Sequence, residues 1–221
     1  QSLLLASQYF SSVYDNLGAL HISFYDPVQK ALKYAKYQDQ ILSEQTIDNS
    51  GDVGKYNHIL VDKNNSIHII YFDSLQTALK FIVYKNNNWT VPIIIDEHGD
   101  VGTYSSFSID QNGMLHILYV DTTNNSVYYS NNSLGNWTRL LVDSNGGGDS
   151  NMKIDHKGNI HAVYYDLVNK DLKYAFKEAV SSSFSVQTIE ATGFVGVYHD
   201  FTLDSFGNAN IVYYDESNGD L

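Results

Sequence analysis

The sequence contains no cysteine among its 221 residues, which excludes disulfide bonds, thiolate metal sites and cysteine nucleophiles. It has only two prolines, and no apolar run approaches the roughly 20 residues of a membrane-spanning helix. Basic residues are scarce as well, because 13 Lys and Arg stand against 25 Asp and Glu and give a formal charge of −12. Phosphate binding needs clustered Lys and Arg, so we expect no nucleic-acid partner. Because no long apolar run is present, we also expect no membrane insertion.

Aromatic residues and small polar residues are abundant instead. The chain has 18 Tyr and 10 Phe, and its hydrophobic fraction of 43% suffices for a buried core. Asn, Ser and Gly suit tight turns, and short runs of aromatic and β-branched residues are typical of strands. No stretch of about ten residues shows the spacing of an amphipathic helix. The composition therefore predicts an all-β protein.

One seven-residue phrase recurs along the chain. Its pattern is an apolar residue, then His-x-x-Tyr-x-Asp or a close variant, at Leu20–Asp26, Ile67–Asp73, Leu115–Asp121 and Ile160–Asp166. A fifth copy, Ala209–Asp215, has Asn210 in place of the histidine. The closing aspartates follow one another at intervals of 47, 48, 45 and 49 residues. This period is close to that of propeller blades, which is about 40 to 50 residues.

Each period divides into four short strands, which we call strands a to d. In the third copy we expect them at Tyr104–Asp110, Leu115–Asp121, Ser126–Asn131 and Trp137–Asp143. Strand a ends in a turn of the form Asp-x-x-Gly, where glycine supplies a positive φ without steric cost. Radially repeated four-stranded units predict a β-propeller.

The period predicts five blades in a single domain over residues 1–221. The expected blades are about 8–48, 55–96, 103–143, 149–190 and an incomplete 197–221. Residues 1–7 align with the end of a strand d, so we expect them to close the last blade. For the missing strand c, the polypeptide either continues past Leu221, receives a strand from another chain, or belongs to a larger ring.

In period and architecture the whole chain resembles tandem-repeat β-propellers of the lectin kind. Five-bladed tachylectin-type and six-bladed fucose-lectin-type proteins are the examples, and the resemblance rests on the four-stranded repeat and its period of about 47 residues. The sequence lacks the Gly-His and Trp-Asp pair of WD repeats and the Ser-x-Asp-x-Gly-x-Thr-Trp box of sialidases. The resemblance implies carbohydrate binding, and it transfers no individual binding residue.

We interpret the repeated residues as structural. Four histidines, one for each blade, would lie too far apart to reach the ~2 Å ligand distances of a metal. We expect them to be buried, neutral and hydrogen-bonded to the adjoining blade: His21, His68, His116 and His161. The aspartates that end strands b and a should accept backbone N–H groups in the following turns. They are Asp26, Asp73, Asp121, Asp166 and Asp215 on strand b, and Asp15, Asp62, Asp110, Asp155 and Asp204 on strand a. We expect no metal and no cofactor.

Departures from the repeat are the better functional signals. Four residues before the aspartate that closes strand a, the series reads Ser11, His58, Ser106, Asn151 and Asp200. With His199, the odd members His58 and Asp200 are candidates for holding a small polar ligand in a central channel, and a solvated channel lining is the alternative. The only arginine, Arg139, is expected on a solvated outer strand.

Trp89 and Trp137 each open a strand d after an Asn-rich turn. An exposed ring there would suit stacking against a sugar, whereas a buried ring would cap the blade. Sites for N-glycosylation of the form Asn-x-Ser/Thr lie in or beside predicted turns, at Asn64, Asn88, Asn124, Asn131 and Asn136.

Three functions follow from these observations. The leading one is a non-enzymatic binding propeller, extracellular or at the cell surface, with several similar weak sites for glycans. The second is a structural subunit that assembles with further copies of itself through donated strands, as in a filament or surface layer. The third is a glycan-active hydrolase with a channel carboxylate such as Asp200, although no Gly-x-Ser-x-Gly, His-Glu-x-x-His or phosphate-loop motif is present.

Overall fold

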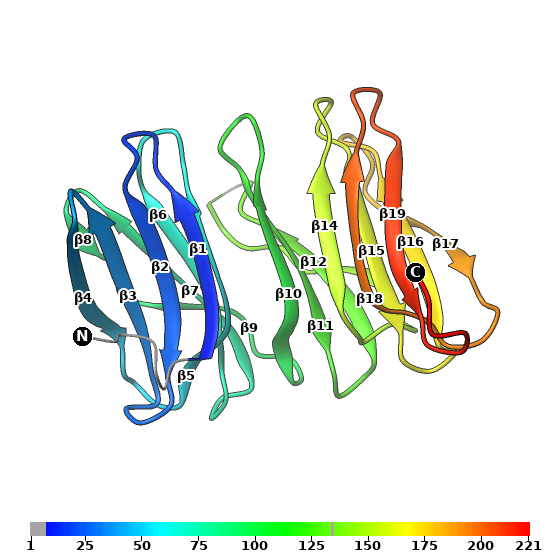
Figure 1. Cartoon of the computed structure of the whole chain (residues 1–221), viewed down its shortest axis with the longest axis horizontal. Helices are drawn as coiled ribbons and strands as arrows, with labels where there is room; N and C mark the ends of the chain where they lie inside the picture. Colours follow the sequence, from blue (N-terminus) through cyan, green and yellow to red (C-terminus); the bar gives the residue numbers. More distant parts are fainter. Residues whose placement is uncertain (1–7, 134) are drawn as a thin grey trace. The chain divides into compact units, whose positions relative to one another are not determined.

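The computed structural model describes residues 8–133 and 135–221. Within these ranges the regular secondary structure consists of β-strands, which confirms the prediction of an all-β protein (Figure 1). The described part contains no helix long and apolar enough to cross a membrane. The expected closing strand at residues 1–7 lies outside the described residues.

The chain divides into two compact units, with the boundary between Thr103 and Tyr104. The first unit holds two antiparallel sheets. Sheet 1 has the strand order β1 (Gln8–Tyr14), β2 (Leu20–Asp26), β3 (Ala31–Gln38) and β4 (Ile41–Asp48). Sheet 2 consists of β5 (Val53–Val61), β6 (Ile67–Asp73), β7 (Ala78–Lys85), β8 (Asn88–Trp89) and β9 (Ile93–Asp96), and both β8 and β9 pair with β7.

Three further sheets follow. Sheet 3 has the order β10 (Val101–Ile109), β11 (Leu115–Asp121), β12 (Ser126–Asn131) and β13 (Leu140–Asp143), and the unit boundary falls within β10. Sheet 4 has the order β14 (Ser150–Ile154), β15 (Ile160–Asp166), β16 (Asp171–Lys177) and β17 (Ser185–Glu190). Sheet 5 pairs β18 (Val195–Leu203) with β19 (Ala209–Asp215). The four-stranded antiparallel sheets are those of propeller blades, and a single ring of five blades stays a prediction.

Burial along the strands explains the sheet order. The second strands β11 and β15 are buried at every residue, whereas the fourth strands β4 and β17 are mostly exposed. Apolar side chains of neighbouring sheets interlock within each unit. Sheets 1 and 2 share a core of Leu32, Val53, Ile69, Tyr71 and Ile82, and sheets 3 and 4 share one of Leu118, Val127, Ile160 and Tyr164.

The turns after the first and second strands are organised by aspartate side chains. Asp15 Oδ1 accepts the backbone N–H groups of Leu17 and Ala19 at 2.9 and 2.8 Å. Asp26 Oδ1 accepts those of Val28 and Gln29 at 2.9 and 3.0 Å. The corresponding aspartates of the other four sheets make the same two kinds of contact. These bonds satisfy backbone donors that the strands leave unpaired.

A buried lysine connects neighbouring sheets. Lys80 Nζ lies 3.3 Å from Asp73 in its own sheet and 3.2 Å from Asp48 at the end of sheet 1, and Tyr71 OH donates to Asp48 at 2.6 Å. Lys173, Asp166, Asp143 and Tyr164 repeat this arrangement between sheets 3 and 4. Each buried carboxylate is thereby paired, as burial requires.

Sheet 3 departs from this pattern, because Tyr128 occupies the lysine position. The guanidinium of Arg139 lies 3.7 Å from the centre of the Tyr128 ring and 3.9 Å from Asp121 Oδ2. Arg139 therefore replaces the missing lysine cation by stacking on the tyrosine. Arg139 is exposed directly before β13, in agreement with the predicted solvated outer position, and it makes these two contacts in addition.

Candidate functional site

The repeated histidine joins two side chains of its own sheet. His21 Nδ1 lies 2.5 Å from Tyr34 OH, and His21 Nε2 lies 3.1 Å from Asp15 Oδ2. His116 and His161 repeat the tyrosine contact at 2.6 Å, with Tyr129 and Tyr174. The expectation that these histidines bond to the adjoining blade is therefore wrong, because their partners come from strands a and c of the same sheet.

Sheet 2 lacks one member of this group. Phe81 occupies the tyrosine position, so the buried His68 Nδ1 has no hydrogen-bond partner within the described residues, although His68 Nε2 contacts Asp62 at 3.2 Å. The His-Tyr contact occurs in sheets 1, 3 and 4 alike, and in sheets 3 and 4 the histidine Nε2 lies 3.6 Å from the strand-a aspartate. This repetition indicates a structural role for the histidine and its tyrosine partner.

Between sheets 1 and 2, and again between sheets 3 and 4, an aromatic ring from the second sheet of the pair covers the tyrosine that contacts the repeated histidine. Trp89 packs edge to face on Tyr34 with ring centres 5.1 Å apart, and Phe184 packs on Tyr129 at 5.5 Å. The indole Nε1 of Trp89 is buried and its ring packs on Tyr34, which favours the alternative of a ring that caps the blade, and sugar stacking at this residue stays a prediction. Trp137 is half-buried in the segment between β12 and β13.

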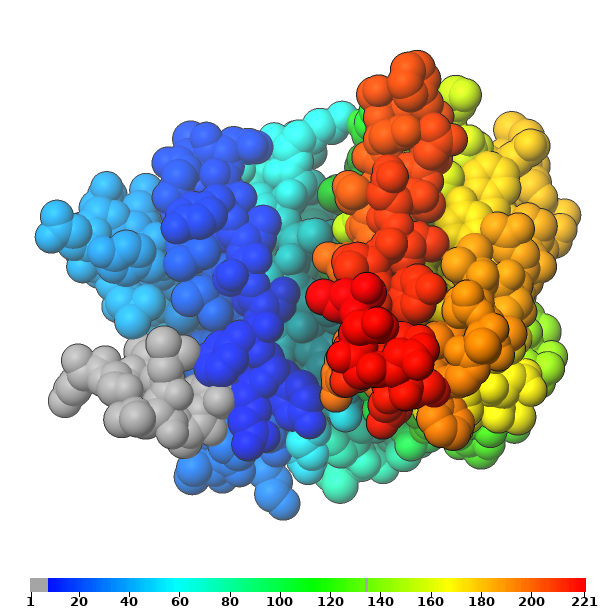
Figure 2. Space-filling view, turned by 45° about the vertical axis from the view of Figure 1, so that its right-hand side comes forward, coloured from blue at the N-terminus to red at the C-terminus, as the bar shows by residue number. Residues whose placement is uncertain are grey.

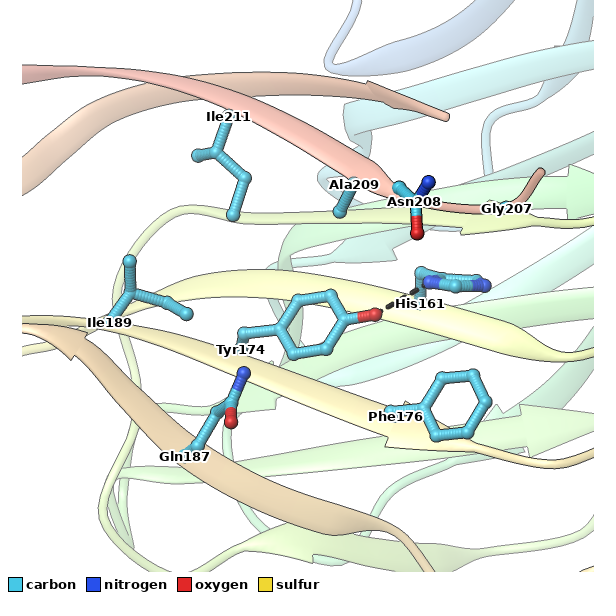
Figure 3. Close-up of a pocket in the computed structure, with 9 residues that line it drawn as sticks. All are labelled: His161, Tyr174, Phe176, Gln187, Ile189, Gly207, Asn208, Ala209 and Ile211. Atoms are coloured by element: carbon cyan, nitrogen blue, oxygen red, sulfur yellow. Dashed lines mark hydrogen bonds between the residues drawn. The ribbon is translucent and has the colours of Figure 1, made fainter. Parts of the chain in front are cut away.

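The third tyrosine of the series lines a groove between sheets 4 and 5. Figure 3 shows the Tyr174 ring in the middle of this groove, which has a volume of about 480 Å³. Sheet 4 contributes His161, Tyr174, Phe176, Gln187 and Ile189, and sheet 5 contributes Gly207, Asn208, Ala209 and Ile211. In Figure 2, β18 and β19 (orange to red) run along the surface beside sheet 4. No aromatic side chain of the described residues in sheet 5 lines the groove.

The groove combines apolar faces with amide groups. Tyr174, Phe176, Ile189 and Ile211 provide apolar surface, and the Phe176 ring packs edge to face against His161 at 5.1 Å. The amide nitrogen of Gln187 points toward Tyr174, and the amide oxygen of Asn208 points into the groove (Figure 3). The described lining residues include no Asp, Glu, Lys or Arg.

The titratable groups beneath the groove are held in neutral form or paired. Burial lowers the pKa of His161, although Asp155 acts in the opposite direction. Burial, with the charge of Asp155, raises the pKa of Tyr174. Burial would raise the pKa of Asp155, but hydrogen bonds from Asn159, Lys157 and His161 lower it overall. A ligand in the groove would therefore meet a neutral imidazole and a neutral phenol.

The residues predicted to line a central channel do not gather into one site within the second unit. His199 is buried, and its Nδ1 and Nε2 lie 2.9 and 3.0 Å from the carbonyl oxygens of Gly196 and Val163. Asp200 is exposed, and its Oδ1 accepts the backbone N–H of Phe201. Adjacent strand residues point to opposite faces, which separates this pair.

Three members of the same series form clamps between first strands. Ser11 Oγ accepts the N–H of Ile59, and Ser106 Oγ accepts that of Met152, each at 3.1 Å. Asn151 Nδ2 donates to the carbonyl of His199 at 3.2 Å. His58 is half-buried on β5 and pairs with Ile70 of β6. The series therefore connects neighbouring sheets.

The five candidate glycosylation sites differ in exposure. Asn64, Asn88, Asn124 and Asn136 are exposed, whereas Asn131 is half-buried. Asn131 Nδ2 donates to Tyr129 OH at 3.1 Å, and Asn124 Nδ2 donates to Asp121 at 2.8 Å. Among the described residues, no group of three or more His, Cys, Asp or Glu could hold a metal ion.

Comparison with known sequences gives no relative. No protein-family model matches the chain, and no curated protein matches it.

Comparison with solved structures gives a likeness of fold. A protein of unknown function from Dyadobacter fermentans aligns with a TM-score of 0.66 and 11% identity, over 94% of this chain and 75% of that one. The Aleuria aurantia lectin, in complex with Fucα1-6GlcNAc, aligns with a TM-score of 0.59 and 12% identity, over 96% and 72%. An exo-β-1,3-galactanase from Phanerochaete chrysosporium aligns with a TM-score of 0.54 and 11% identity, over 98% and 62%. The chain thus shares its all-β fold with the lectin, which is a β-propeller, and also with a glycoside hydrolase.

Proposed function

We propose that the protein is a non-enzymatic, lectin-like module that binds a neutral glycan in the groove between sheets 4 and 5. One observation carries the proposal. The Tyr174 ring lines the groove beside Phe176 and Ile211. A pyranose has the size of such a ring, and its hydroxyl groups need the fixed polar partners that Gln187 and Asn208 offer.

The chemistry of the lining supports binding over hydrolysis. Glycoside hydrolysis requires a pair of carboxyl groups beside the scissile bond. The described groove residues include no carboxylate, and the nearby Asp155 is engaged by Asn159 and Lys157 in its own turn. The neutral lining also favours a neutral sugar over a sialic or uronic acid.

A glycan array followed by calorimetry tests the proposal. The panel should include Fucα1-6GlcNAc and β-1,3-galactotriose, the sugars bound in the similar lectin and galactanase structures. Ala209→Trp would place an indole in the groove, as Trp89 covers Tyr34, and should abolish binding at the groove. Asn210→Trp is the matched control, because the next residue of a strand points to the opposite face. Equal loss in both variants, or no binding of any neutral glycan, contradicts the proposal.

A structural role is the second candidate, and the same groove favours it. In the other two sheet pairs an aromatic side chain fills this position, so a strand of a second copy could deliver such a ring. Sedimentation at increasing protein concentration separates the two functions. Concentration-dependent assembly that Ala209→Trp suppresses would support the structural role, and a monomer at all concentrations would contradict it.

We further propose that the protein acts outside the cell or at its surface. The observation in favour is that Asn64, Asn88 and Asn124 lie exposed at turns or strand ends, within Asn-x-Ser/Thr. Enzymatic removal of N-glycans from the protein isolated from its source should lower its mass. An unchanged mass would remove this support.

A further inference from the structure

We infer a second sugar-binding site in the first unit, built on a cluster of tyrosines on strands β1, β2 and β5. We call Tyr9, Tyr25 and Tyr56, with Asp52 and Lys55, the tyrosine cluster. The inference rests on the proposed glycan-binding function and adds a site that is distinct from the groove. It would make the protein bivalent toward glycans.

Backbone strain first marks this place. Tyr9 and Tyr56 adopt φ values of +53° and +49°, which bulky side chains avoid because of steric conflict with the backbone. Both sit at irregularities in strand pairing, where β1 and β5 shift register against β2 and β6. Tyr104 on β10 repeats the conformation with φ of +46°. Glycine would adopt this conformation without strain, so tyrosine carries a conformational cost at these positions.

Neighbouring side chains hold the strained backbone in place. The amide nitrogen of Asn57 in sheet 2 donates to the carbonyl oxygen of Tyr9 in sheet 1, and also to that of Gly54 at 2.8 Å. Ser23 Oγ donates in turn to the amide oxygen of Asn57. In the second unit Ser150 Oγ donates to the carbonyl of Tyr104 at 2.5 Å. The tyrosine rings are thus presented from a fixed backbone.

The rings form a partly exposed apolar surface. The Tyr9 and Tyr56 ring centres lie 4.7 Å apart with a tilt of 49°, and Tyr25 packs edge to face on Tyr9 at 6.2 Å. Tyr9 is 37% exposed, whereas Tyr25 beneath it is only 4% exposed. Strand β1 (blue) lies at the surface seen in Figure 2. A ring-shaped ligand can therefore stack on Tyr9 without moving the core.

A charged pair lies beside this surface. Asp52 accepts the hydroxyl of Tyr25 at 2.6 Å and contacts Lys55 Nζ at 3.0 Å. Lys55 Nζ also lies 5.2 Å from the centre of the Tyr25 ring. Burial, with the charge of Asp52, raises the pKa of Tyr25 to about 12, so this hydroxyl stays a donor. The ammonium keeps donors for a ligand, and the carboxylate keeps acceptor lone pairs.

These properties fit a neutral sugar. A sugar ring presents an apolar C–H face to an aromatic plate, and its hydroxyl groups both donate and accept at the edge. Lys55 and Asp52 offer both partners with no net charge between them, so a charged ligand gains little from the pair. The second site thus takes the same chemical class as the groove.

Calorimetric stoichiometry with Fucα1-6GlcNAc and β-1,3-galactotriose tests the inference. The unmodified protein should bind two sugars per chain, and Tyr56→Gly should weaken one site by about tenfold while the folded state stays intact. Glycine relieves the positive φ, so a loss of binding without a loss of stability identifies a functional ring. Lys55→Met is a second variant that leaves the backbone unaltered. Tyr14→Ala is the matched control, because Tyr14 is a more exposed tyrosine of β1.

The outcomes distinguish the two sites. Loss of one of two sites in Tyr56→Gly and Lys55→Met, with both retained in Tyr14→Ala, supports the inference. One sugar per chain, lost in Ala209→Trp and kept in Tyr56→Gly, overturns the second site and leaves the groove proposal intact. One sugar lost in Tyr56→Gly and kept in Ala209→Trp does the reverse. No binding of either sugar overturns both.

Discussion

At the scale of the residue, sheets 2 and 3 differ in the hydrogen bond between the repeated histidine and the strand-c side chain. His116 Nδ1 contacts Tyr129 OH, whereas the buried His68 Nδ1 faces Phe81 and lacks a partner within the described residues. Tyr129→Phe should lower the free energy of unfolding by about 1 to 3 kcal/mol, because it orphans a buried nitrogen. Phe81→Tyr should raise it by about 0.5 to 1.5 kcal/mol. Urea unfolding measures both, and changes of the same sign would contradict the argument.

The buried histidines also predict a pH dependence. Burial lowers the pKa of His68, His116 and His161 from the ordinary value of 6.5. Below pH 6.5 the unfolded chain therefore binds protons before the folded one does, so stability falls as the pH decreases toward the folded-state pKa values. Each unit of lowering contributes about 1.4 kcal/mol.

Urea unfolding between pH 7.5 and 5 checks this dependence. His116→Asn is the matched variant, because the fifth copy of the repeat carries Asn210 at this position. It should flatten the pH dependence, and a slope that does not change would assign the effect to other groups. Below pH 3.8 a second loss is expected, as aspartates with lowered pKa such as Asp15 and Asp62 become protonated.

At the scale of the element, buried ion pairs connect neighbouring sheets. Lys173 Nζ lies 2.7 Å from Asp166, which is fully buried, and 2.9 Å from Asp143. Lys173→Met would leave these carboxylates without their cation and should cost about 3 to 5 kcal/mol. Lys157→Met is the control at an exposed turn position and should change stability by less than about 0.5 kcal/mol. Similar effects of the two variants in urea unfolding would show that the pairing is not important.

His199 connects sheet 5 to sheet 4 in a comparable way. Both ring nitrogens face carbonyl oxygens, one of them on Val163 of sheet 4. Asn57 fills the corresponding position in sheet 2, where its amide donates to Gly54. His199→Ala should cost about 1 to 3 kcal/mol, and His199→Asn should recover part of it. Hydrogen exchange of β18 and β19 reports the change locally, and equal exchange in all three proteins would contradict this role.

The elements also show where sequence reasoning succeeds and where it fails. The expected second and third strands of the third copy coincide with β11 and β12, because buried strands carry a strong apolar signal. The fourth strand was expected from Trp137 and begins at Leu140, since exposed outer strands carry little pattern. Trp89 and Tyr174 could not be assigned from sequence, because the ring that covers a tyrosine comes from another sheet. The strained φ of Tyr9 and Tyr56 likewise leaves no mark in the repeat.

At the scale of the whole molecule, charge should determine that a neutral glycan binds in preference to an anionic one. The chain carries a formal charge of −12 and has an isoelectric point of about 4.8, yet the described lining of the groove is neutral. A neutral sugar should therefore bind with an affinity that changes by less than about twofold between 50 and 500 mM salt, because no charged contact is screened. Polyanions such as heparin should be repelled at low salt.

Calorimetry across this salt range, with heparin as the competing ligand, checks both expectations. A sulfated glycan that bound more tightly than a neutral one would require clustered cations, which the described groove residues do not provide. A steep salt dependence for the neutral sugar would point in the same direction and move the site away from the groove. Salt-independent binding of the neutral sugar, with the groove site lost in Ala209→Trp, would instead support the uncharged groove between sheets 4 and 5 as a binding site for a neutral glycan.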